Sequence, residues 1–112
     1  RSYKRWAMEG SLRIHRGSRD IEGQLIDLSL GGVLILTRRD SGISILDQLQ
    51  FDLCLEGGSE FENVNGLVIR LQAVNTDPQA RYVKYALKFV DMPHSTETRL
   101  LEYLKKIYPY EW

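Results

Sequence analysis

The sequence has little cysteine and no excess charge of either sign. Its single cysteine, Cys54, excludes an internal disulfide and is typical of a reducing compartment; on its expected strand we interpret it as a small buried hydrophobe. The 15 Lys and Arg residues balance 15 Asp and Glu residues, so bulk attraction to nucleic acid or to an anionic membrane is not indicated. The longest apolar run, residues 28–36, is too short to span a bilayer, and we expect no membrane insertion by this segment.

Side chains that carry chemistry are also sparse. His15 and His94 are far apart, and with one cysteine they form no recognisable metal-ligand spacing. The glycine pairs at 31–32 and 57–58 lack the Lys-Ser/Thr that follows the glycines of a phosphate-binding P-loop. We therefore expect a protein that is not an enzyme and that needs no metal and no cofactor.

The 112 residues, of which 43% are hydrophobic and 27% charged, are enough for one small globular domain, 1–112. Basic residues crowd the first twenty positions, whereas none occurs between Arg39 and Arg70. The N-terminal end can therefore attract an anion locally although the whole chain is neutral. Because the chain begins with Arg1 rather than Met, we expect it to be a piece of a longer protein.

Short apolar stretches separated by Gly, Asp and Asn clusters are typical of antiparallel β structure. The predicted strands cover residues 7–15, 21–28, 33–37, 50–55, 64–74 and 81–90. From Ser95 onward, apolar residues recur at helical spacing, and Ser95 or Thr96 is expected to cap the helix. The prediction is an all-β fold: an N-terminal arm (1–6), a six-stranded antiparallel barrel (7–90) and a C-terminal α-helix (95–108).

Two short motifs carry most of the functional information. Residues 1–5 read Arg-Ser-Tyr-Lys-Arg, and residues 27–32 read Asp-Leu-Ser-Leu-Gly-Gly. Arg pairs bidentately with a guanine edge or a phosphate, and Asp accepts hydrogen bonds from the N–H groups of the guanine Watson–Crick edge. A hydroxyl beside bare backbone N–H groups suits a phosphate oxygen. Together these parts suit an anionic guanine nucleotide.

The order R-x-x-x-R and then D-x-S-x-x-G, with a strand-like segment between them, resembles the PilZ domain family. The segments 66–70 and 85–89 resemble later strands of that family, and the amphipathic end resembles its final helix. The resemblance implies a barrel with a helical lid that binds the bacterial second messenger cyclic di-GMP. It also assigns the ligand contacts, with Asp27 reading the guanine edge, to Arg1, Arg5, Asp27, Ser29, Gly31 and Gly32.

Three further residues are weaker candidates, each with two interpretations. Lys4 either adds a phosphate contact or faces water. Trp6 either stacks on guanine or packs the arm against the barrel, and packing is the favoured interpretation. Arg70 either stacks on a purine or is an ordinary surface residue. The family often has glycine near the position of Ala86, so a backbone contact from that strand to the ligand is in doubt.

The resemblance implies a cytoplasmic receptor, or the cytoplasmic part of a larger membrane-bound protein. Ligand binding would order the arm and act on an attached domain or a separate effector protein, with motility, exopolysaccharide synthesis or biofilm formation as the output. The alternative is a degenerate PilZ-like protein-interaction module that binds no nucleotide. A barrel that binds RNA or single-stranded DNA is disfavoured by the neutral charge and by the lack of an aromatic stripe on one strand, so no DNA or RNA partner is expected.

Overall fold

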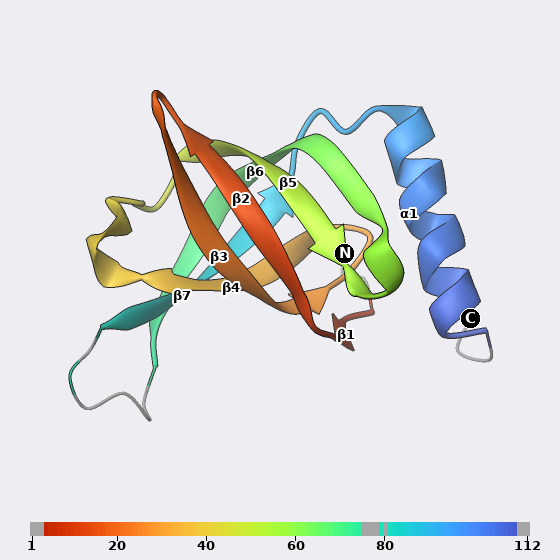
Figure 1. The fold of residues 1–112 in the computed structure, drawn as a ribbon, viewed down its shortest axis with the longest axis horizontal. Helices are drawn as coiled ribbons and strands as arrows, with labels where there is room; N and C mark the ends of the chain where they lie inside the picture. The colour runs from red at the N-terminus through yellow and green to blue at the C-terminus, as the bar shows by residue number, and fades with distance from the viewer. Residues whose placement is uncertain (1–3, 75–78, 80, 110–112) are drawn as a thin grey trace.

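The computed structural model describes residues 4–74, 79 and 81–109, and it shows a β-barrel with one long helix at its side (Figure 1). The elements, in chain order, are β1 (Trp6–Ala7), β2 (Gly10–Arg16), β3 (Arg19–Leu28), β4 (Gly32–Arg38), the 3₁₀ turn η1 (Arg39–Ser41), β5 (Gln48–Leu55), the 3₁₀ turn η2 (Glu56–Gly58), β6 (Glu60–Ala73), β7 (Tyr82–Phe89) and α1 (His94–Ile107).

Six strands close the barrel in the order β3-β2-β5-β6-β7-β4, and β4 pairs back with β3. Every pairing is antiparallel. The predicted fold is therefore confirmed. The short β1 is an additional strand that the sequence did not predict, because a two-residue strand leaves no periodic pattern; it pairs with β3 alone.

Alternation along the strands builds the core. On β5, Leu49, Phe51, Leu53 and Leu55 are buried, while the residues between them face outward. The expectation that Cys54 is buried is wrong: its place in this alternation puts the side chain on the exposed face.

Helix α1 packs against the barrel through Leu100, Tyr103 and Leu104. The Tyr103 hydroxyl donates to the Glu56 carbonyl at 3.0 Å, which fixes the helix beside η2. The predicted side-chain cap is wrong. The helix begins at His94, ahead of Ser95, and its N-cap is Pro93, whose carbonyl accepts from the Glu97 N–H at 3.0 Å. None of the helices in the described ranges is long and apolar enough to cross a membrane.

Candidate ligand-binding site

The pairing of β1 with β3 brings the two sequence motifs together. Trp6 lies opposite Leu28 and Ala7 opposite Asp27. Arg5, just before β1, therefore reaches Asp27, and its Nη1 lies 3.1 Å from the carboxylate Oδ1. The guanidinium is half exposed, and the Asp27 side chain is 17% exposed. A guanidinium and a carboxylate thus lie side by side at the surface, within reach of a ligand. Arg1 lies outside the described residues.

Ser29 is buried and closes the turn between β3 and β4. Its Oγ accepts hydrogen bonds from the N–H groups of Gly31 and Gly32, each at 3.1 Å, and it donates to the Gly32 carbonyl at 3.3 Å. The Ser29 backbone N–H also donates to that carbonyl at 2.9 Å. The hydroxyl is therefore engaged by its own turn in this state, and its contact with a ligand stays a prediction.

The two glycines of the motif belong to the seam where β4 meets β7. A Cβ on Gly32 would lie 2.1 Å from the Leu87 carbonyl oxygen, so only glycine fits against that strand. The Gly31 carbonyl accepts from the Phe89 N–H at 2.9 Å. The structure thus gives Gly32 a packing role, and close approach of a ligand to these glycines stays a prediction.

Asp27 belongs to a row of residues that crosses the outer wall of the barrel. It is paired with Leu34 on β4, Leu34 with Ala86 on β7, and Ala86 with Arg70 on β6. Directly paired residues of antiparallel strands share a face, and Val33, Ile35 and Leu87 occupy the core, so the row lies on the outer side of the wall, where the small side chain of Ala86 is itself only 2% exposed. Strands lie about 4.8 Å apart, which places Asp27 and Arg70 about 14 Å apart, with the apolar residues Leu34 and Ala86 between them.

Two β-bulges turn the charged ends of this row outward. The pairing of β3 with β4 shifts between Leu25 and Asp27, and the pairing of β6 with β7 shifts between Val68 and Arg70. Strict alternation would place Asp27 on the face of buried Leu25, and Arg70 on the face of buried Val68. One extra residue at each bulge reverses this orientation, which is a common use of bulges at binding sites. Neither bulge has a recognisable signal in the sequence.

Trp6 joins the arm to the C-terminal helix. Its side chain is buried and stacks on Tyr108, with ring centroids 4.2 Å apart, and the Lys4 ammonium lies 4.8 Å from its ring centroid. The Tyr108 hydroxyl donates to the Ala7 carbonyl at 3.4 Å. The favoured interpretation of Trp6 as a packing residue agrees with this arrangement. Lys4 is exposed and covers Trp6, and Tyr108 is a contact residue of the arm that neither motif indicates.

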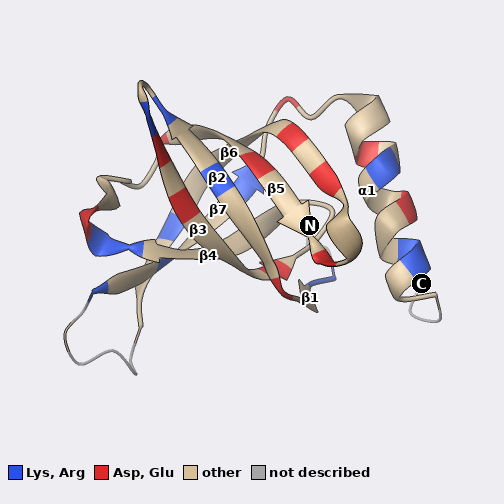
Figure 2. Cartoon of the chain, in the orientation of Figure 1, with Lys and Arg blue, Asp and Glu red and all other residues tan. Residues whose placement is uncertain are grey.

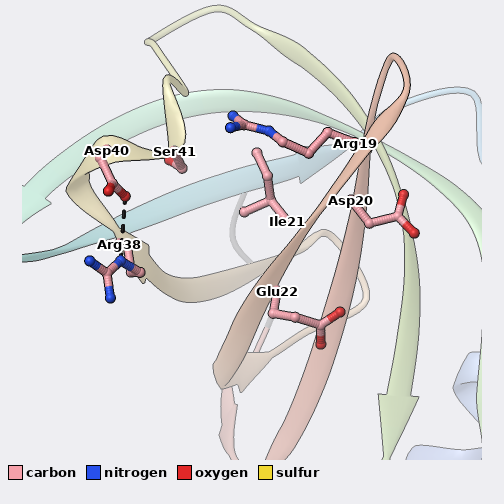
Figure 3. A pocket seen from close by; sticks show the side chains of 7 residues that line it. All are labelled: Arg19, Asp20, Ile21, Glu22, Arg38, Asp40 and Ser41. Atoms are coloured by element: carbon pink, nitrogen blue, oxygen red, sulfur yellow. Dashed lines mark hydrogen bonds and ion pairs between the residues drawn. The ribbon is translucent and has the colours of Figure 1, made fainter.

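The hollows in the barrel surface suit the expected nucleotide less well than the outer surface around Arg5 and Asp27. One of about 450 Å³ lies beside the row and is lined by Ala7, Met8, Glu9, Gln24, Leu25, Ile26 and Glu56. Its charged groups are carboxylates, which repel a phosphate. Another, of about 270 Å³, lies at the opposite end of β3 (Figure 3). There Arg38 is held by Asp40 at 3.4 Å, and Arg19 is accompanied by two further carboxylates, Asp20 and Glu22.

A separate charged cluster lies on the barrel wall away from the row. The His15 imidazole bridges two carboxylates, with Nδ1 3.2 Å from Asp20 and Nε2 3.2 Å from Asp52. Hydrogen bonds that the imidazole donates to these carboxylates raise the pKa of His15. The backbone N–H of Asn63 donates to Asp52 at 3.0 Å and lowers the pKa of that carboxyl group. In the described part of the chain, no cluster of His, Cys, Asp and Glu is arranged to hold a metal ion.

Charges of both signs alternate along α1 and are mixed over the barrel in the view of Figure 2. In that cartoon no element of the described chain is predominantly Lys and Arg, whereas a protein that binds a nucleic-acid backbone commonly clusters them on one element or face. The local pairing of Arg5 with Asp27 is therefore the more informative electrostatic feature.

Comparison with known proteins identifies the family. The model of the PilZ domain matches residues 1–106, and the chain therefore belongs to the PilZ domain family. None of the curated proteins matches the sequence.

Solved structures share the fold at low sequence identity. The PilZ domain of YcgR from Escherichia coli, solved with c-di-GMP, has a TM-score of 0.80 at 15% identity, over 97% of this chain and 92% of that one. The K. pneumonia MrkH–c-di-GMP complex has a TM-score of 0.81 at 16% identity, over 96% of this chain and 52% of that one. The Bacillus subtilis inhibitor of motility MotI/DgrA has a TM-score of 0.77 at 17% identity, over 100% of this chain and 53% of that one. The chain thus spans about half the length of MrkH and MotI/DgrA.

Proposed function

We propose that this PilZ domain is a bacterial receptor for cyclic di-GMP rather than an enzyme, and that it binds the nucleotide on the outer wall of its barrel. The pairing of Arg5 with Asp27 is the observation that carries the proposal. These two side chains offer a guanidinium for phosphate or the guanine N7/O6 edge, and a carboxylate for the guanine N1–H and N2–H groups. The structural relatives YcgR and MrkH, both solved with c-di-GMP, support the choice of ligand.

The ligand must compete with the contact that Arg5 and Asp27 make with each other. An exposed ion pair contributes only about 0–1 kcal/mol, so its exchange for ligand contacts costs little. Each bidentate Arg–guanine pair supplies about 1–3 kcal/mol of discrimination, whereas micromolar affinity needs about 8 kcal/mol. Several contacts must therefore act together. We assign the others to Arg1, Ser29, Gly31 and Gly32, with Lys4 and Arg70 as peripheral candidates at the edges of the site.

The contacts of Trp6 suggest how binding is relayed. Arg5 precedes Trp6 directly, and Trp6 stacks on Tyr108 just beyond the end of α1. A ligand that pulls Arg5 away from Asp27 would shift the arm against this stack and so act on the C-terminal helix. The responding element would be an attached domain or a separate protein in the bacterial cytoplasm, with motility, exopolysaccharide synthesis or biofilm formation as the output.

Titration calorimetry with cyclic di-GMP tests the proposal. Arg5→Ala and Asp27→Ala should each weaken binding at least about tenfold, which corresponds to about 1.4 kcal/mol. Arg13→Ala is the matched control, because the Arg13 guanidinium is about as exposed as that of Arg5 and also pairs with a carboxylate, Glu22, at 3.6 Å; this variant should bind as the parent does. Cyclic di-AMP should not bind, since adenine lacks the N1–H and N2–H groups that Asp27 would read.

Thermal unfolding of the same variants separates a binding defect from a folding defect. Each should stay within about 1 kcal/mol of the parent stability. A parent chain that gives no heat with cyclic di-GMP, yet retains a protein partner, would favour the alternative of an interaction module that binds no nucleotide. Equal binding by Arg5→Ala, Asp27→Ala and Arg13→Ala would contradict the assigned site.

A further inference from the structure

Exposed apolar side chains gather at the end of the barrel where β6 leaves β5. Four large hydrophobic residues are 44–71% exposed there: Ile45, Leu46, Ile69 and Leu71. The Leu46 N–H donates to the Val68 carbonyl at 2.7 Å, so the loop that precedes β5 lies against β6 just before Ile69. Clustered apolar side chains at a surface indicate an interaction site more strongly than scattered ones.

The backbone of β6 has an open edge at the same place. The last residue of β6 that pairs with β5 is Leu67, opposite Gln48, and the Val68 N–H donates to the Asp47 carbonyl at 2.9 Å. Beyond this point, residues 70–73 pair with β7 on one side and have no strand on the other within the described ranges. Figure 1 shows β6 and β7 continuing together toward the grey trace, away from α1.

This edge has little of the usual protection against strand pairing. Residues 69–73 read Ile-Arg-Leu-Gln-Ala; they contain neither Lys nor Pro, and Arg70 is their one charged residue. Leu46, beside the start of the edge, is 71% exposed and adopts a φ of 72°, a left-handed conformation that is unfavourable for a bulky residue. Backbone strain at an exposed apolar residue is more typical of a contact surface than of a solvated loop.

The sequence of the edge is complementary to itself. Leu71 and Ala73 pair with buried Tyr85 and Val83, and therefore share the inner face, whereas Arg70 and Gln72 lie on the outer face. When two copies pair antiparallel about a two-fold axis, a register centred on Leu71 places the two leucines together and Arg70 opposite the partner's Gln72. A register centred on Arg70 would instead oppose two like charges.

We propose that the occupant of this edge is a second copy of the chain, paired β6 to β6 about a two-fold axis at Leu71. The pairing would continue the sheet across both barrels, with the exposed side chains of Ile45, Leu46 and Ile69 at its margin. Such a short edge gives an interface at the small end of the range, so the association is weak and depends on protein concentration. The proposal does not rest on nucleotide binding by Arg5 and Asp27, although it shares Arg70 with the edge of the proposed ligand site.

Disulfide trapping tests both the pairing and its register. In a Cys54→Ser background, Leu71→Cys should form a disulfide-linked dimer under mild oxidation, because a residue on the two-fold axis lies directly opposite its own copy. Ile107→Cys is the matched control, since Ile107 is 43% exposed on α1 and Leu71 is 44% exposed. Efficient crosslinking by Gln72→Cys but not by Leu71→Cys would overturn the register, and equal crosslinking at Leu71 and Ile107 would overturn the pairing.

Charge substitution tests the same axis without a covalent bond. The parent chain should show concentration-dependent dimerisation in sedimentation experiments over about a hundredfold range of concentration, and Leu71→Lys and Leu71→Glu should each be monomeric. A mixture of these two variants should recover the dimer, because opposite charges then face each other across the axis. A parent chain that stays monomeric throughout would overturn the proposal, and so would a mixture that recovers no dimer.

Discussion

The turn at 29–32 and the Arg5–Asp27 ion pair are both drawn from the two sequence motifs, yet the structure uses them differently. Ser29 and Gly32 are buried, and their polar groups and close contacts are engaged within the barrel. Arg5 and Asp27 are accessible, and they are held mainly by each other. The comparison teaches that the turn helps to build the barrel wall, whereas the ion pair remains available to a ligand. Substitutions in the turn should therefore cost stability, and those in the ion pair should cost affinity.

The largest loss of stability is expected for Gly32→Ala. The added Cβ would lie 2.1 Å from the Leu87 carbonyl oxygen, and neither strand can move without breaking the pairing of β4 with β7. We expect a loss of about 3 kcal/mol or more in the free energy of unfolding, measured by chemical denaturation. Gly17→Ala is the control: no atom lies within 4 Å of its new Cβ, and its positive φ costs about 1–2 kcal/mol. Equal losses in the two variants would contradict the packing role of Gly32.

Ser29→Ala should have a smaller but clear effect. It leaves the N–H groups of Gly31 and Gly32 without their acceptor in a largely buried turn, at a cost of about 1–3 kcal/mol. Ser11→Ala on the exposed face of β2 should change stability by no more than about 0.5 kcal/mol. If Ser29→Ala unfolds like the parent but loses ligand affinity, the Ser29 hydroxyl is a ligand contact like Arg5 and Asp27. The assignment of the turn to stability alone would then be wrong.

The smallest effect is expected at His15, which extends the comparison to a second set of exposed charges. The pKa of His15 is raised in the folded state, so its contribution to stability is complete below the unfolded value of 6.5 and is lost as pH rises through the folded value. The lowered pKa of Asp52 gives a contribution that is present above 3.8 and lost as pH falls through its folded value. The cluster should therefore stabilise the fold most between about pH 4 and 6.5.

Thermal unfolding at about pH 6 and pH 8.5 measures this effect. The melting temperature of the parent should fall slightly relative to that of His15→Gln as the pH rises. In Asp20→Asn this pH-dependent fall should be smaller than in the parent but still present, because Asp52 remains beside His15. An identical pH response in the parent and in His15→Gln would show that the cluster is neutral for stability.

Some of these features could be predicted from the sequence because they depend on local patterns. The alternation of apolar residues predicted most of the barrel strands, and the spacing of Leu100 and Leu104 predicted the helix. The start of the helix at His94 and the exposure of Cys54 were missed. The first depends on which carbonyl accepts the first helical hydrogen bond. The second follows from the alternation of β5, in which Cys54 shares the outer face with Gln50 and Asp52, so the strand pattern was a better guide than residue type.

By itself, the sequence determined the class of fold, the family, and the kinds of side chain that we propose to meet the ligand, since strand periodicity and motif order are properties of the chain alone. Only the tertiary structure decided where these side chains point. The β-bulges beside Asp27 and Arg70 reverse the expected orientation, and the pairing of β1 with β3 brings Arg5 to Asp27. The open edge of β6 likewise exists because β5 begins too late in the chain to pair with residues 70–73. These outcomes depend on register between distant strands, which is set by closing the barrel as a whole.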